Sequence, residues 1–181
     1  MLVIYCDGCC ETDRAWMAGF IDGEGCLTIA RQMRKGRPSP AYRVFITVSN
    51  TNRPCLEFFK TLYGGEIYNI HDRRKDKRGT NWAEAYDWYC PVSSSERLLC
   101  DLLPYLRLKQ EQAKILLEFI RSKKGFARKT NAGRNTGSAP LTDEEINHRE
   151  KLRVAVQLLN SKGTRARLQK GSECNESDNL L

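Results

Sequence analysis

Two acidic residues, Asp22 and Glu24, stand where a short apolar helix ends and a strand begins, within residues 16–29. Gly19 and Gly23 stand four positions apart in this segment, so they lie on one helix face. Glycine inside a helix costs about 1 kcal/mol relative to alanine, and two glycines on one face therefore indicate the close approach of a partner backbone. If the partner is a second copy of this helix, four carboxylates converge where the two helix ends meet.

Such a cluster of carboxylates is costly unless a cation, or a bound phosphate with its metal ions, lies among them. Hard oxygen ligands suit Mg²⁺ or Mn²⁺, so the cluster predicts a divalent metal cofactor. The alternative is an ordinary buried helix with a glycine cap, Gly23 or Gly25, and acids that merely lie at its end. The residues alone leave both interpretations open.

Two segments of the chain carry a family resemblance. Residues 17–25, Met-Ala-Gly-Phe-Ile-Asp-Gly-Glu-Gly, resemble the LAGLIDADG motif of homing endonucleases at both glycines, both acids and the apolar positions. Residues 103–113 resemble the segment of the same domain that supplies a catalytic lysine, at about the spacing that the family uses. The similarity covers residues 13–125 and, more weakly, 142–167, and it is closest to the single-motif, homodimeric branch encoded in introns.

The resemblance implies a role for each matching residue. Glu24 would bind the metal through its carboxylate, with the carbonyl of Gly23 as a further ligand, and Asp22 would support the helix end. Lys109 matches the lysine that stabilises charge around the hydrolytic water, and Asn50 falls where the family often has glutamine. The predicted catalytic set is Glu24, Lys109, Asn50 and Asp22, and the predicted dimer interface contains Ala18, Gly19, Asp22 and Gly23.

The charge of the chain favours a polyanionic partner. Lys and Arg exceed Asp and Glu by 30 to 22, a net charge of +8, which favours nucleic acid over an anionic membrane surface. No apolar run approaches the ~18 residues of a spanning helix, and the N-terminus lacks a signal-peptide pattern. We expect a soluble, intracellular protein without a membrane partner, in an organelle (chloroplast or mitochondrion) or in the cytoplasm of a bacterium or phage host.

The eight cysteines are expected to be free thiols, because most lie in apolar segments of a chain without a secretion signal. Cys6, Cys9 and Cys10 have half of a zinc-site spacing without a second pair or a nearby histidine. A leader without defined structure is therefore favoured for residues 1–12 over a structural zinc site.

Hydrophobic periodicity predicts one domain, residues 13–162, followed by a disordered tail at 163–181. Its first helix, capped by Thr12 or Asp13, runs to about Gly23. The elements predicted after it are strands 26–35 and 42–50, a helix 54–64, strands 66–71 and 84–92, a helix from 93 interrupted at Pro104, and helices 109–121 and 142–159, with a linker at 126–140. This order predicts an α+β domain, and the resemblance implies the LAGLIDADG fold, with a four-stranded antiparallel saddle sheet and helices on one face.

The other face of this sheet is expected to contact DNA. Strand alternation directs polar and basic side chains outward, and a twisted ribbon of strands fits the major groove. A basic run at 71–79 would form a hairpin tip, although such a run is also typical of a solvated loop. The predicted DNA-binding residues are Cys26, Thr28, Ala30, Gln32, Arg34, Arg37, Arg43, Phe45, Thr47, Asn69, His71, Arg73, Arg74, Lys75, Lys77, Asp87 and Tyr89.

These features favour a metal-dependent endonuclease that cuts both strands of double-stranded DNA at a long pseudo-palindromic site. The chain has a single acidic motif, so a double-strand cut requires a homodimer. Two alternatives on the same scaffold are a maturase that assists splicing of its intron RNA and a DNA-binding regulator without cleavage. A regulator gains nothing from acids placed beside phosphate, so Glu24 and Lys109 favour an enzyme over a regulator.

Overall fold

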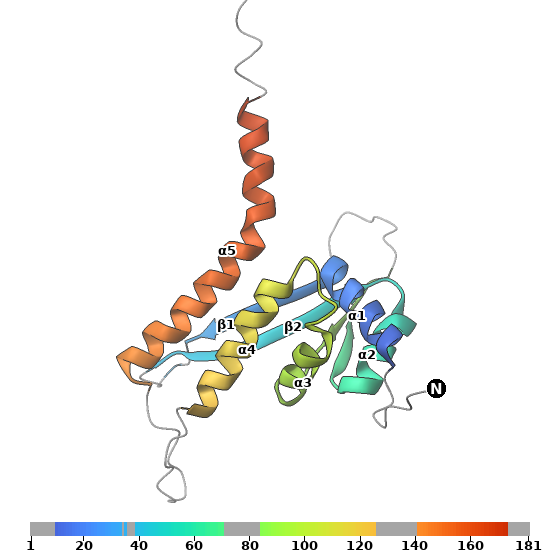
Figure 1. Ribbon diagram of the computed structural model, residues 1–181, viewed down its shortest axis with the longest axis horizontal. Helices are drawn as coiled ribbons and strands as arrows, with labels where there is room; N and C mark the ends of the chain where they lie inside the picture. Colours follow the sequence, from blue (N-terminus) through green and yellow to red (C-terminus); the bar gives the residue numbers. More distant parts are fainter. Residues whose placement is uncertain (1–9, 34, 36–38, 71–83, 126–140, 174–181) are drawn as a thin grey trace, which may run out of the picture.

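The computed structural model describes residues 10–33, 35, 39–70, 84–125 and 141–173, with backbone alone for 124–125 and 162–173 (Figure 1). Five helices and four strands are assigned in this part of the chain. In chain order they are α1 (Glu11–Glu24), β1 (Gly25–Gln32), β2 (Ala41–Asn50), α2 (Arg53–Tyr63), β3 (Glu66–Asn69), β4 (Tyr86–Tyr89), α3 (Val92–Leu102), α4 (Gln110–Gly125) and α5 (Asp143–Glu173). None of the described helices is long and apolar enough to cross a membrane.

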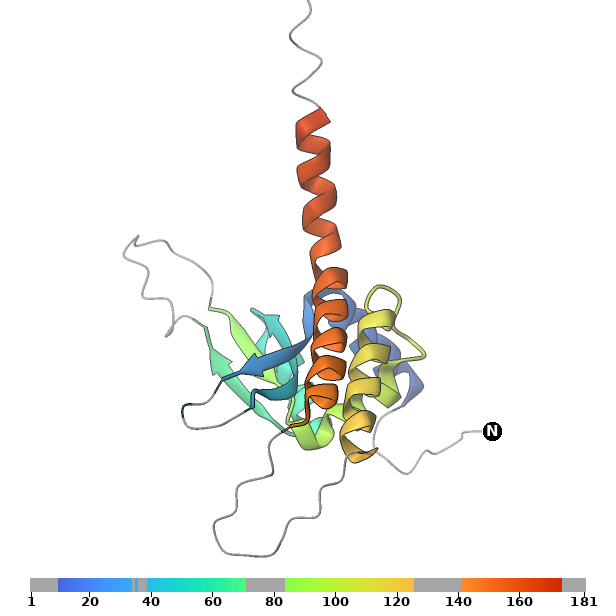
Figure 2. The same ribbon diagram turned by 90° about the vertical axis from the view of Figure 1, so that its left-hand side faces the viewer.

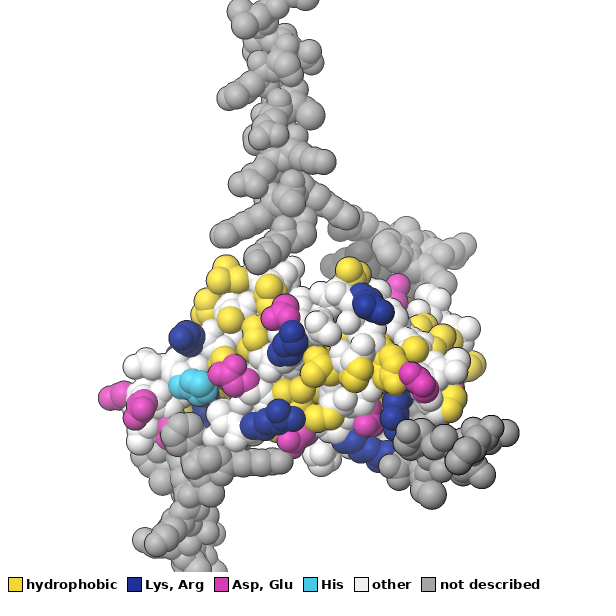
Figure 3. Space-filling view, in the orientation of Figure 1, with side chains coloured by type: hydrophobic (Ala, Val, Ile, Leu, Met, Phe, Trp, Pro, Cys, Tyr) yellow, Lys and Arg dark blue, Asp and Glu magenta, His cyan; other side chains and the backbone are white. Residues whose placement is uncertain are grey.

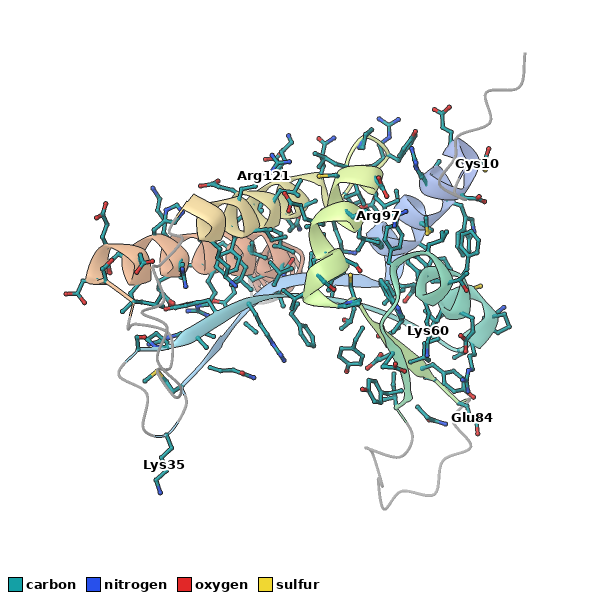
Figure 4. All side chains as sticks on the ribbon, turned by 90° about the horizontal axis from the view of Figure 1, so that it is seen from below. Cys10, Lys35, Lys60, Glu84, Arg97 and Arg121 are labelled. Carbon is teal, nitrogen blue, oxygen red and sulfur yellow. The ribbon has the colours of Figure 1, made fainter. Side chains whose placement is uncertain are left out.

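The four strands form one antiparallel sheet in the order β1-β2-β4-β3. The helices gather on one side of this sheet and leave the other side without a helical layer, as the two perpendicular views show (Figures 2 and 4). We call the side without helices the outer face. The predicted α+β architecture, with a four-stranded antiparallel sheet and helices on one face, is confirmed.

The core lies between the sheet and the helices and follows the predicted alternation. Leu27 and Ile29 of β1 are buried, as are the alternate β2 residues Val44, Ile46 and Val48. Figure 3 shows the side of the molecule on which α4 lies, where acidic, basic and apolar side chains are interspersed. The described part of this helical side therefore presents no field of a single charge.

Trp88 of β4 fixes the turn between α2 and β3. Its ring is fully buried, and its Nε1–H donates a 2.9 Å hydrogen bond to the carbonyl of Gly64. Gly65 has φ +93°, and a Cβ there would lie 2.1 Å from the carbonyl oxygen of Tyr89. The turn therefore requires glycine both for its backbone conformation and for its close approach to β4.

Several element ends differ from the prediction. Helix α1 begins at Glu11 rather than after Thr12 or Asp13, because the Asp13 carboxylate accepts a 3.2 Å hydrogen bond from the backbone N–H of Cys10 and closes the first turn. Helix α5 continues to Glu173, past its predicted end near residue 159 and into the predicted tail. The helix continues through Gly163 and Gly171, each of which costs only about 1 kcal/mol relative to alanine.

The N-terminal half of α5 covers β1, the edge strand of the sheet. Asn160 donates from Nδ2 to the carbonyl of Leu27 at 3.1 Å, and the Tyr42 hydroxyl donates to Glu150 at 2.8 Å. Leu152 and Val156 are buried between these polar contacts. The helix thereby protects an edge that would otherwise be open to pairing with another strand.

Candidate active site

The end of α1 meets the segment that leads into α4, and Asp22 joins the two. Its Oδ2 accepts hydrogen bonds from the backbone N–H groups of Arg107 at 2.7 Å and Leu108 at 3.1 Å. Its Oδ1 accepts the backbone N–H of Lys109 at 2.8 Å. Both carboxylate oxygens thus bind unpaired amides in front of α4, which is the position where a negative charge is most stabilising. We call this region the α1–α4 junction.

The side chain of Lys109 extends to the carboxyl end of α1 within the same junction. Its Nζ donates to the carbonyl of Ile21 at 2.9 Å and to the carbonyl of Asp22 at 2.5 Å. The last carbonyls of a helix lack partners within it and carry the negative end of its dipole, so they are natural acceptors for an ammonium group. Burial lowers the pKa of Lys109, while the charges of Asp22, Cys26 and Glu24 act in the opposite direction.

Glu24 differs from Asp22 in the exposure of its carboxylate. It is the last residue of α1 and is exposed, and its carboxylate makes no hydrogen bond or ion pair with the described residues. Gly23 beside it is also exposed. The junction therefore holds a lysine in place by its contacts and leaves one carboxylate available for a group from outside the chain.

The donors at this junction fit a divalent ion only in part. No cluster of three or more Asp, Glu, His or Cys side chains that could hold a metal occurs within the described ranges. Mg²⁺ is commonly bound through one or two carboxylates together with substrate phosphates, rather than by an all-protein cage. The Glu24 carboxylate and the carbonyl of Gly23 match that pattern as the protein's part of such a site.

The predicted catalytic residue Asn50 is engaged elsewhere. It lies on β2 two positions after Val48, which pairs with Gly25, so its backbone runs beside the end of α1. Its side-chain Oδ1, however, accepts a 2.7 Å hydrogen bond from the backbone N–H of Asn52, at the start of α2. Its role in chemistry remains a prediction.

The predicted dimer residues separate into two groups. Ala18 is fully buried with Met17 and Ile21 in the core of its own chain, so its assignment to the interface was wrong. Ala18 therefore lies on the side of α1 that packs into the core. Gly19 and Gly23 are exposed, and a Cβ added at either would meet no atom of the chain within 4 Å. Nothing within the described chain therefore requires glycine at these two positions.

The outer face carries most of the predicted DNA-binding residues that the structure describes. Strand pairing places Thr47 between Cys26 and Tyr89, and Ala30 beside Arg43. Thr47 is only 8% exposed, so it is less available than predicted. The other described residues on this face that were predicted are Thr28, Gln32, Phe45 and Asp87. The predicted residues Arg34, Arg37, His71, Arg73, Arg74, Lys75 and Lys77 lie outside the described residues.

Asn69 was assigned to the wrong face. It pairs with Tyr86, and its neighbour on the same side of β3 is Ile67, which pairs with the buried Trp88. Tyr68, which pairs with Asp87, occupies the outer face instead. The missed signal was Ile67, because its pairing with an inward tryptophan fixes the alternation of β3. Lys35 was not among the predicted DNA-binding residues either. It extends on the side of the sheet away from the helices (Figure 4).

Comparisons with known proteins bear on this arrangement. No family model matches the chain. The chain is 34% identical over 113 residues to the DNA endonuclease I-CvuI of Chlorella vulgaris, a match that spans 59% of this chain and 63% of that relative. The chain therefore aligns with somewhat less than two thirds of the length of this curated relative.

Solved structures share the fold over most of the chain. The homing endonuclease I-CvuI, in complex with the I-CreI target in the presence of Mg, matches with a TM-score of 0.59 and 26% identity over 82% of each chain. The I-LtrWI LAGLIDADG homing endonuclease, bound to target DNA, matches with a TM-score of 0.57 and 16% identity over 81% of this chain and 44% of that one, which supports the fold alone. The acid-ended glycine helix, the sheet that follows it and these matches agree: the chain has the fold of the LAGLIDADG homing endonucleases and is similar to them in sequence.

Proposed function

We propose that this protein is a site-specific endonuclease that hydrolyses both strands of double-stranded DNA, acting as a homodimer with Mg²⁺ or Mn²⁺. The observation that carries this proposal is the α1–α4 junction, where Lys109 is fixed to the carbonyls of Ile21 and Asp22 while the exposed Glu24 carboxylate makes no hydrogen bond or ion pair with the described residues. A protein that only binds DNA has no use for an unpaired carboxylate near phosphate, because the two charges repel.

Each residue of the junction has a separate task in this proposal. Glu24 would supply a carboxylate to the metal, with the carbonyl of Gly23 as a further ligand. The bound ion would lower the pKa of a water molecule and stabilise charge on the scissile phosphate. Lys109 would stabilise the negative charge that develops around that phosphate. Asp22 is a positioning residue, because its three hydrogen bonds to backbone amides hold the segment that presents Lys109.

The dimer is proposed from the exposed glycines and from the requirements of a double-strand cut. Gly19 and Gly23 form an open strip on α1 where a second helix could approach closely, and the strip leads directly to Glu24. Two strands contain two scissile phosphates, whereas each chain offers one Glu24. A two-fold axis through the paired helices would supply the second carboxylate, and it would make the target pseudo-palindromic.

DNA is proposed to lie on the outer face, where no helix covers the strands. Arg43 on this face is exposed and has no hydrogen bond or ion pair with the described residues, as expected for a side chain that contacts a partner. The width of the major groove admits a ribbon of antiparallel strands. The related I-CvuI structure was solved with a DNA target, which supports the same partner here.

Substitution of Glu24 by Gln tests this function. The target is first selected from random duplexes by binding in EDTA, and cleavage of the selected duplex is then followed in Mg²⁺. Wild type should cut both strands, and Glu24→Gln should bind with near wild-type affinity and not cut, because the change removes a metal ligand's charge and alters none of the residues proposed to contact the bases. Glu57→Gln, at an exposed acid of α2 paired with Arg53, is the matched control and should cut normally. Cleavage by Glu24→Gln at the wild-type rate would refute the mechanism.

A further inference from the structure

The outer face is divided into two chemically different parts. Along β1 and the neighbouring part of β2 it presents Gln32, Thr28 and Arg43, which are polar or cationic. On β4 and β3 it presents Tyr89, Tyr68 and the carboxylate of Asp87, and the ring of Phe45 from β2 lies against Tyr89. Residues of the first kind bind phosphates and guanine, whereas a carboxylate and the face of an aromatic ring do neither.

One aromatic ring comes from each of the three strands. Phe45 of β2 contacts Tyr89 of β4 at 5.5 Å between ring centroids, and Tyr68 of β3 contacts Tyr89 at 5.4 Å, both edge to face. We call these three residues the aromatic ridge. Tyr68 is 46% exposed, although an aromatic ring on a sheet is usually covered. The ridge is therefore a surface of aromatic rings that runs from β2 to the edge strand β3, on a face that the proposed function assigns to DNA.

Asp87 lies beside this ridge and is held in place. Its Oδ1 accepts a 2.5 Å hydrogen bond from the Ser49 hydroxyl, and its Oδ2 accepts a 3.4 Å hydrogen bond from the Tyr89 hydroxyl. Strand pairing puts Ser49, Asp87 and Tyr68 in one row across the sheet. Within the described residues no Lys, Arg or His forms an ion pair with Asp87. The carboxylate is therefore oriented and retains acceptor capacity, since an ionised carboxylate can accept about four hydrogen bonds.

A fixed carboxylate in the major groove restricts which base it can face. It repels the phosphates and the O6 and N7 acceptors of guanine, and it accepts from an amino group such as N4 of cytosine. An apolar ring in the same groove gains most from the C5-methyl group of thymine, which is the apolar substituent that the major groove offers. Both partners belong to pyrimidines.

We propose that the aromatic ridge and Asp87 are specificity residues that select pyrimidines, with the ridge contacting thymine methyl groups and Asp87 accepting from the amino group of a cytosine. The part of each half-site over β2, β4 and β3 is then pyrimidine-rich on the contacted strand. The inference rests on the proposed function in one respect, namely that the outer face lies on DNA.

Removal of single methyl groups from the DNA tests the ridge. Each thymine of the selected half-site is replaced by deoxyuridine in turn, and the dissociation constant for wild type is measured in EDTA so that no strand is cut. Replacement at one or more positions should weaken binding about fourfold, the value of one buried methyl-sized group. In Tyr68→Ala thymine and deoxyuridine should bind equally at one of those positions, whereas Arg43→Ala should retain the full difference.

Asp87→Asn tests the carboxylate without changing its shape. An amide recognises adenine, whereas a carboxylate accepts from cytosine, so the preferred base at one position should change from cytosine to adenine. Thermal unfolding of both variants distinguishes lost recognition from lost folding, and Tyr68→Phe, which keeps the ring, should retain the methyl effect. If wild type selects a sequence but binds thymine and deoxyuridine equally at every position, or if Asp87→Asn keeps the cytosine preference, this inference is wrong and the proposed function survives. If wild type selects no sequence, both fail.

Discussion

The α1–α4 junction and the outer face of the sheet hold their side chains in opposite ways. At the junction Asp22 and Lys109 bind backbone groups of the other segment, so their positions follow from the main chain. On the outer face Phe45, Tyr89 and Asp87 contact other side chains, and Arg43 has no partner among the described residues. Side chains bound to backbone give a fixed geometry that suits catalysis, whereas side chains that contact each other can be exchanged to change a target sequence. Changes at the junction should therefore alter the rate, and changes on the outer face should alter the choice of base.

The largest effect is expected from Lys109→Met. The substitution keeps most of the length of the side chain and removes the charge next to the proposed metal site, so cleavage at saturating protein should fall by about 10²- to 10³-fold. Affinity for the selected target should change by less than about threefold, because one phosphate contact contributes little to binding. Single-turnover cleavage and binding in EDTA measure the two quantities. Lys114→Met, at an exposed lysine paired with Glu111, is the control. If affinity fell and the cleavage rate did not, Lys109 would be a phosphate contact. The proposed contrast between a junction that sets the rate and an outer face that sets base choice would then be wrong.

Gly19→Leu tests whether the junction needs a second chain. A Cβ at Gly19 meets no atom of the same chain, so the isolated fold should tolerate leucine, and a helical leucine should even be favoured over glycine by about 0.8 kcal/mol. A partner helix packed on this strip would be pushed away, at a cost of typically 1–3 kcal/mol. Sedimentation should show wild type at about twice the 20.8 kDa of one chain and the variant as a monomer that does not cut both strands. A monomeric wild type that still cuts both strands would contradict the homodimer.

Arg43→Ala should have a smaller effect, confined to recognition. Arginine forms paired hydrogen bonds with guanine O6 and N7, and the loss of such a pair costs about 1–3 kcal/mol of discrimination at one base pair. The variant should therefore accept other bases at one position and cut its selected target at the wild-type rate when saturated. A base-preference scan of every half-site position measures this change. A uniform loss of affinity with an unchanged profile would show that Arg43 binds a phosphate.

The sequence was informative where a pattern is local and dense. The acid-ended helix and the alternation of Leu27, Ile29, Val44, Ile46 and Val48 predicted α1, β1, β2 and the side of the sheet that is buried. Strand β3 offers only four residues, so the alternation of Ile67, Tyr68 and Asn69 was undetermined until its pairing with β4 fixed it. The contacts of Asp22 join residues 85 to 87 positions apart, and no periodicity predicts such contacts. The resemblance to a family indicated Lys109, but not the backbone groups that hold it.

Asn160 provides the last and smallest test, because it connects the two regions. Its Nδ2 donates to Leu27 of β1, between the outward residues Cys26 and Thr28, and its Oδ1 accepts a 3.4 Å hydrogen bond from Gln112 of α4. Asn160→Ala leaves the Leu27 carbonyl and the Gln112 amide without this partner. The free energy of unfolding should fall by about 1 kcal/mol, which lowers Tm by about 2–4 °C for a chain of this size. Cleavage rate and base preference should each change by less than about threefold.

Combining Asn160→Ala with Lys109→Met and with Arg43→Ala extends this test. Residues without shared partners give effects that add within about 0.5 kcal/mol. If the junction and the outer face are independent, the effect of each substitution should be the same with and without Asn160. A double-mutant cycle with a coupling above about 1 kcal/mol would mean that α5 transmits the fit of the DNA on the sheet to the junction. In that case catalysis and base choice could not be altered separately.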